Sequence, residues 1–119
     1  MTILYQFLTR DEDIYLTRTA GEIISHYGPG AQLIKLQEEC CELVAAIVRC
    51  SLKPGDEHEA QFYEELADVT LMIEQIIGSM DAKQGRRLAE IVMAKANRQL
   101  RRMAEEDDKA AARDMAHGC

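Results

Sequence analysis

This 119-residue chain has only four cysteines and two prolines, and it has no tryptophan. It therefore lacks the dense set of cysteines that forms disulfides in small extracellular domains. None of the cysteines, Cys40, Cys41, Cys50 and Cys119, is in a Cys-x-x-Cys pair, and the terminal Cys119 has no evident role. No apolar run approaches the roughly 18 residues of a membrane span, and the apolar N-terminal stretch is too short for a signal peptide. We therefore expect a reduced, cytoplasmic protein with no membrane partner.

Basic residues are also in the minority, since 14 Lys and Arg against 21 Asp and Glu give a formal net charge of −7. Binding to nucleic acid requires a net basic face that neutralises phosphates, so no nucleic-acid partner is expected. Aromatic residues make up only 5% of the chain, whereas residues of high helix propensity are abundant. A chain of this length fits one domain, and we predict a single all-α domain over residues 1–119.

Turn and capping signals divide the chain into an arm, four helices and a tail. A Thr-x-x-Glu capping box opens at Thr9, and similar signals open at Asp56 and Asp81. Turns that contain Gly and Pro separate the first three helices. The predicted segments are an N-terminal arm at 1–8, helices at 9–27, 31–52, 57–80 and 82–106, and a tail at 107–119 that is expected to fray.

The predicted helices favour a four-helix bundle that self-associates. Helix 31–52 is apolar around most of its circumference, which is typical of a helix that is largely buried. One small bundle does not readily cover that much apolar surface. We therefore expect a homodimer or a homotetramer.

Helix 31–52 also carries acidic residues in an unusual place. At 100° per residue, Glu39 and Glu42 share one face with Gln32 and Lys35. Because the rest of the helix is nearly all apolar, this acidic strip is expected to point into protein or into a cleft.

Glu65 and Asp68 repeat the three-residue spacing beside the apolar stripe of helix 57–80. A single pair of this kind is typical of a solvated helix face that is balanced by Lys and Arg. Two pairs in strongly apolar helices instead indicate a site, because clustered carboxylates repel one another unless a cation lies between them. Oxygen ligands alone favour Mg²⁺, or Mn²⁺, over Zn²⁺.

The segments that contain these pairs, AQLIKLQEECCELVAAI and EELADVTLMIEQII, resemble the MazG-like all-α nucleoside triphosphate pyrophosphohydrolase family. The family pattern is EExxE, a spacer and ExxD, and the resemblance extends from about Tyr27 to Arg102. It implies a four-helix MazG-like bundle that hydrolyses an NTP or dNTP to the monophosphate and pyrophosphate with Mg²⁺. Nucleotide-pool house-cleaning is compatible with this activity.

The resemblance also implies roles for individual acids. Glu39, Glu42, Glu65 and Asp68 match the metal ligands of the family. Glu38 would be a supporting acid or a contact to a second metal. For the reaction itself we predict Glu38 and Glu39 as catalytic carboxylates, since Glu38 or a ligand carboxylate could accept the proton from water.

Basic residues are concentrated in one segment, since residues 83–102 hold seven basic side chains and one acidic side chain. A solvated helix that balances acidic neighbours would look the same, but the resemblance favours Lys95 and Arg98 as phosphate contacts. Lys35 either contacts a phosphate or pairs with the acid one turn later. Gln32 lies at the end of the acidic strip, where it is placed to touch the base or ribose.

Two other functions fit the same residues. One is phosphoribosyl-ATP pyrophosphatase, an enzyme of the same superfamily chemistry. The other is a non-catalytic helical oligomer that acts as a partner-binding or regulatory module. In that case a bound metal ion would only stabilise the structure.

Overall fold

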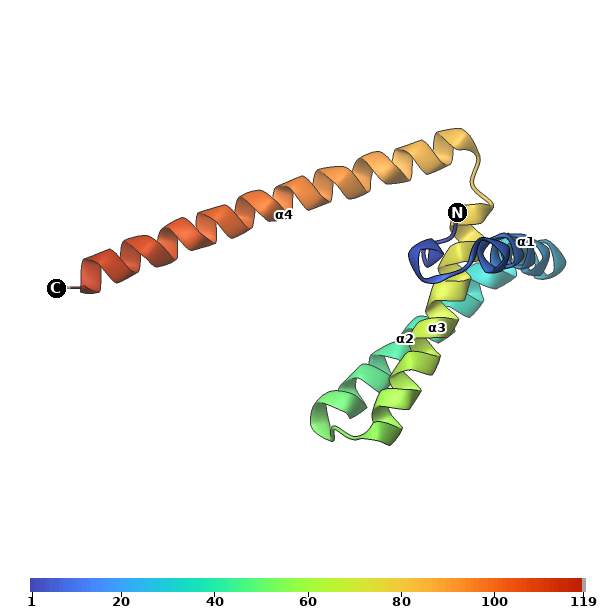
Figure 1. Cartoon of the computed structure of the whole chain (residues 1–119), viewed down its shortest axis with the longest axis horizontal. Helices are drawn as coiled ribbons and strands as arrows, with labels where there is room; N and C mark the ends of the chain where they lie inside the picture. The colour runs from blue at the N-terminus through green and yellow to red at the C-terminus, as the bar shows by residue number, and fades with distance from the viewer. Residues whose placement is uncertain (119) are drawn as a thin grey trace. The chain divides into compact units, whose positions relative to one another are not determined.

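The computed structural model describes residues 1–118, and all of its regular elements are helices (Figure 1). No strand occurs among these residues, so the predicted all-α class is confirmed. None of the described helices is long and apolar enough to cross a membrane. Cys119 lies outside the described residues. The elements are a 3₁₀ turn η1 (Tyr5–Phe7) and the helices α1 (Arg10–Tyr27), α2 (Pro29–Leu52), α3 (Asp56–Gly78) and α4 (Ala82–His117).

The first helix boundary follows the predicted capping chemistry. Thr9 Oγ1 accepts a hydrogen bond from the Glu12 backbone N–H at 3.2 Å, and Glu12 Oε1 accepts one from the Thr9 N–H at 2.9 Å. Gly28 then ends α1 with φ 90°, a left-handed conformation that favours glycine. Because Pro29 suits the first helical position, α2 begins two residues earlier than predicted.

The start of α3 differs from the prediction. Gly55 is the N-cap residue and makes no side-chain cap, so the capping box expected at Asp56 is wrong. Asp56 instead lies inside the first helical turn together with Glu57 and Glu59. Acidic residues are favourable there because they face the positive end of the helix dipole.

By internal packing the chain divides into two units, one formed by Met1–Met80 and one that begins at Asp81. In the first unit α2 and α3 run side by side as a hairpin, and α1 packs against both (Figure 1). The hydrophobic core of this unit is small. Its buried apolar residues are Ala20, Ile24, Ala46, Val69 and Met72.

The N-terminal arm is fixed to this unit by two acids. Asp13 Oδ1 accepts hydrogen bonds from Thr2 N at 2.8 Å and from Thr2 Oγ1 at 2.6 Å. The buried Glu74 accepts a hydrogen bond from the Ile3 N–H. The Thr2 hydroxyl and N–H lower the pKa of Asp13 because they stabilise its charged form.

The expected burial of α2 is wrong within this unit, because only the face toward α1 and α3 is covered. On the outer face five large apolar side chains are exposed. They are Leu33, Ile34, Val44, Val48 and Leu52.

The second unit is α4, and its start agrees with the prediction. Asp81 Oδ1 accepts from Gln84 N at 2.8 Å, and Gln84 Oε1 accepts from Asp81 N at 3.0 Å. The helix continues to His117, beyond the predicted end at residue 106. Helix propensity explains the difference, because the acids at 105–108 are followed by Lys109 and an alanine-rich run. A lone helix has no core of its own, so the four-helix bundle stays a prediction.

Candidate metal centre and adjoining pocket

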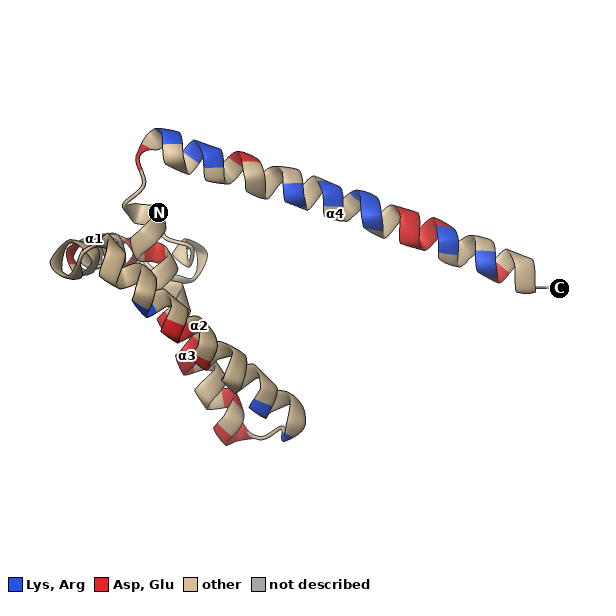
Figure 2. Cartoon of the chain, turned by 180° about the vertical axis from the view of Figure 1, so that it is seen from behind, with Lys and Arg blue, Asp and Glu red and all other residues tan. Residues whose placement is uncertain are grey.

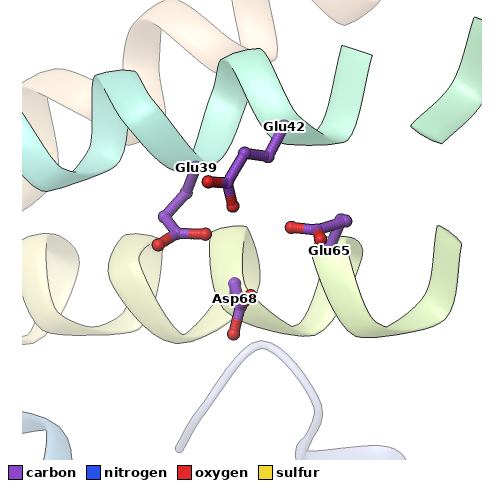
Figure 3. Close-up of side chains that lie close together, drawn as sticks. All are labelled: Glu39, Glu42, Glu65 and Asp68. Atoms are coloured by element: carbon purple, nitrogen blue, oxygen red, sulfur yellow. The ribbon is translucent and has the colours of Figure 1, made fainter. Parts of the chain in front are cut away.

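The four predicted acidic ligands come together between α2 and α3 (Figure 3). Glu39 and Glu42 lie on α2, while Glu65 and Asp68 lie on α3. One carboxylate oxygen from each residue lies within 4.8 Å of the oxygens from the other three. The three-residue spacing produces this arrangement, because it places two acids of each helix on the face toward its neighbour.

Two of these carboxylates have buried oxygens without a partner. Glu39 is only 7% exposed, and its Oε2 atom has no hydrogen-bond partner among the described residues. Glu65 Oε2 is in the same situation. Buried carboxylate oxygens are costly when they are left unpaired, and like charges nearby add to that cost. The residues present therefore fit a hard divalent cation, which bonds to carboxylate oxygens and offsets their charge.

Lys35 provides the only opposite charge that pairs with this cluster within the described residues. Its Nζ atom lies 3.2 Å from Glu39 Oε1 and 3.4 Å from Glu38 Oε2. The Glu39 and Glu38 carboxylates raise the pKa of Lys35. Of the two roles considered for Lys35, the ion pair is observed and the phosphate contact stays a prediction. Glu38 is exposed and does not belong to the four-carboxylate cluster.

A pocket of about 460 Å³ adjoins the acidic cluster. Glu39, Asp68 and Lys35 form its charged part. Its remaining wall is mostly apolar, with a polar patch formed by two glutamines. That wall includes Ile23, Tyr27, Gln32, Leu71, Met72 and Gln75. The pocket therefore joins a cation-binding end to an apolar end, and its volume is in the usual range for small-ligand sites.

Sequence reasoning missed Met72 and Gln75 in this pocket. Gln75 is 1% exposed, and Gln32 Nε2 donates a hydrogen bond to its Oε1 atom at 2.7 Å. The signal was present, because Gln75 follows Asp68 by seven residues and Gln32 precedes Glu39 by seven. A seven-residue separation is two helical turns and keeps both members of each pair on one face.

The predicted phosphate contacts Lys95 and Arg98 lie on α4, in the second unit. Together with Ile91, Ala94 and Arg101 they line a shallow groove of about 390 Å³. Figure 2 shows that basic residues predominate over the first part of α4 and that acidic residues follow. The assignment of Lys95 and Arg98 to phosphate binding stays a prediction.

Comparisons with protein-family models, with curated proteins and with solved structures each found no match. A functional conclusion for this chain therefore depends on its own residues and on the site that they form.

Proposed function

We propose that the protein is a Mg²⁺-dependent pyrophosphohydrolase that cleaves an NTP or dNTP to the monophosphate and pyrophosphate. The observation that carries this proposal is the gathering of Glu39, Glu42, Glu65 and Asp68 with two buried carboxylate oxygens left unpaired. The adjoining pocket of about 460 Å³ supports it, because it has room for a nucleoside beside the acids.

In this proposal the acidic residues have two different roles. Glu39, Glu42, Glu65 and Asp68 would hold Mg²⁺ or Mn²⁺, which when bound supplies charge neutralisation for the phosphates and a more acidic water. Glu38 stands next to these ligands with an exposed carboxylate, which makes it the proposed acceptor of the proton from the attacking water.

Cationic side chains bind the rest of the triphosphate in this proposal. Lys35 reaches both Glu38 and Glu39, so its ammonium is positioned at the boundary between the acids and the pocket. Lys95 and Arg98 are proposed as further phosphate contacts, as the family resemblance implies. Polyphosphate needs such partners because the metal neutralises only part of its charge.

Pyrophosphate release from a panel of NTPs, dNTPs and phosphoribosyl-ATP tests the proposal. We expect release with Mg²⁺ or Mn²⁺, none with excess EDTA, and no replacement of Mg²⁺ by Zn²⁺. Release from phosphoribosyl-ATP alone would identify the second enzyme candidate. Background values for every nucleotide in Mg²⁺ would contradict the proposal and favour the non-catalytic module.

A further inference from the structure

A fixed hydrogen-bond relay runs along the wall of the pocket of about 460 Å³. Gln75 Nε2 donates to the Met72 Sδ atom at 3.5 Å, and Gln32 Nε2 donates to Gln75 Oε1 at 2.7 Å. All three residues are buried, with exposed fractions of 6% for Gln32, 6% for Met72 and 1% for Gln75. These side chains therefore have little freedom to exchange partners with solvent.

The relay has one direction because its last member cannot donate. A thioether sulfur only accepts hydrogen bonds, so the Gln75 amide turns its NH₂ group toward Met72 and its carbonyl toward Gln32. Gln32 must then turn its own NH₂ group toward Gln75. Gln32 Nε2 also donates a long hydrogen bond to the Met72 Sδ atom at 3.9 Å, so Met72 favours this orientation of both glutamines.

The consequence is an unsatisfied neutral acceptor on the pocket wall, apart from the carboxylate oxygens of the acidic cluster. Gln32 Oε1 has no hydrogen-bond partner among residues 1–118, and it does not belong to the fully buried unpaired atoms. Gln32 lines the pocket that Glu39 and Asp68 also line, so this oxygen is open to a ligand held there. An acceptor in a buried wall selects for a ligand that donates an N–H, because a carbonyl at the same place leaves both oxygens unpaired.

The other wall residues suit a flat ring. Ile23, Leu71 and Met72 offer apolar contact, and Tyr27 is 63% exposed, which leaves its ring available for stacking. A nucleobase with an exocyclic amino group meets both requirements, since it stacks through its faces and donates through its edge.

We propose that Gln32 Oε1, oriented by Gln75 and Met72, selects substrates whose base bears an amino group over those whose base bears a keto group at the same ring position. This inference rests on the proposed function, which makes the substrate a nucleotide. It adds the chemical class of the base that the site prefers. Cytosine over uracil and adenine over hypoxanthine are the two matched pairs.

Neutral nucleosides test the selection without metal or turnover. Deoxycytidine, deoxyuridine, deoxyadenosine and deoxyinosine are titrated in EDTA, and the NMR signals of the glutamine side-chain amides are followed. We expect the amino member of at least one pair to bind about fivefold more tightly, as one net hydrogen bond of about 1 kcal/mol gives. The shifts should centre on the Gln32 and Gln75 amide groups.

Three variants test whether Gln32 causes the preference for the amino-bearing nucleoside. Gln32→Met removes the acceptor at similar size and should abolish the preference. Met72→Leu removes the sulfur, lets the Gln75 amide turn over and should weaken the preference while the apolar wall is kept. Gln37→Met on the exposed side of α2 is the matched control and should leave the preference unchanged.

Equal affinities within both pairs, no shift with any nucleoside, or a preference that survives Gln32→Met would overturn the inference. Its failure can be told apart from failure of the proposed function. A hydrolase that cleaves dCTP and dUTP, and dATP and dITP, with equal kcat/KM refutes the selection alone. A protein with the nucleoside preference but no pyrophosphate release refutes the hydrolase alone.

Discussion

Glu39 combines three properties that distinguish it from an ordinary helix carboxylate. It is 7% exposed, one of its oxygens pairs with Lys35, and the other has no partner among the described residues. A side chain in this state lowers the stability of the metal-free protein, because its charge is only partly compensated. Such a residue is expected where binding of a cation supplies the missing interactions.

Removing a charge from the cluster should therefore separate activity from stability. We expect Glu39→Gln and Asp68→Asn each to lower turnover at least about a hundredfold, since each removes a ligand from the metal. Without metal, the same variants should melt no earlier than the parent protein, because repulsion among the acids is relieved. Glu57→Gln, in the exposed first turn of α3, is the control and should leave turnover unchanged. Early melting of both variants, with no turnover in the parent, would instead indicate structural ion pairs.

The basic residues of α4 should respond in a different way. Replacing Lys95 or Arg98 by Gln is expected to raise KM more than it lowers kcat, because a phosphate contact of equal strength in ground and transition states affects binding alone. Lys83→Gln, in the first turn of the same helix, serves as the control. An unchanged KM in both variants would show that Lys95 and Arg98 belong to a solvated helix face.

At the scale of helices and turns, the sequence predicted caps that depend on neighbouring side chains, but it did not predict how the helices pack. The capping boxes at Thr9 and Asp81 were predictable because each depends on side chains three residues apart. The box at Asp56 was wrong because the backbone placed Gly55 at the cap, and spacing alone does not decide between neighbours. The end of α4 was missed because a run of acids at 105–108 reads as a break although alanines follow it.

In the candidate site, too, the sequence predicted features that depend on helical spacing but not those that depend on packing. Helical spacing placed four acids on facing surfaces, and the structure brings them together. Spacing did not reveal which carboxylate oxygens are left unpaired or that Gln75 holds Gln32, because both depend on contacts between helices. The attachment of the arm through Thr2 and Asp13 was hidden for the same reason.

This attachment should be sensitive to acid. The pKa of Asp13 is lowered in the folded protein, chiefly by the hydrogen bond from the Thr2 hydroxyl, so its ionised form stabilises the fold. That contribution is present above the ordinary Asp pKa of about 4 and is lost as pH falls through the lower folded value. We expect the Thr2 amide to lose its protection from hydrogen exchange below about pH 4.

Two variants assign the acid response to one carboxylate. Asp13→Asn should remove this pH dependence, because the amide oxygen still accepts a hydrogen bond but does not titrate in this range. Asp11→Asn, on the exposed first turn of α1, should keep it. Thr2 protection that does not fall between pH 6 and the lowest pH at which the parent protein stays folded would show that Asp13 does not hold the arm.

At the scale of the whole molecule, apolar surface exceeds what the first unit covers. The outer face of α2 exposes Ile34, Val44 and Leu52 by 61%, 61% and 81% of their surface. Large apolar side chains exposed along one helix face are typical of an interaction surface. We therefore predict a homodimer or homotetramer in light scattering at micromolar concentration. Val44→Lys should shift the equilibrium toward monomer, while Ser25→Lys on the exposed side of α1 should not. A monomeric parent protein would contradict this prediction.

Titration with Mn²⁺, followed by electron paramagnetic resonance, tests most directly whether Glu39, Glu42, Glu65 and Asp68 hold a divalent cation. The signal of free Mn²⁺ should fall on addition of the parent protein, and bound Mn²⁺ should be displaced by excess Mg²⁺. Glu39→Gln and Asp68→Asn should each weaken this binding at least about tenfold, because each removes one ligand charge. Glu57→Gln should bind as the parent does. Equal Mn²⁺ binding by the parent and both site variants, or no binding by the parent, would contradict a metal centre between α2 and α3.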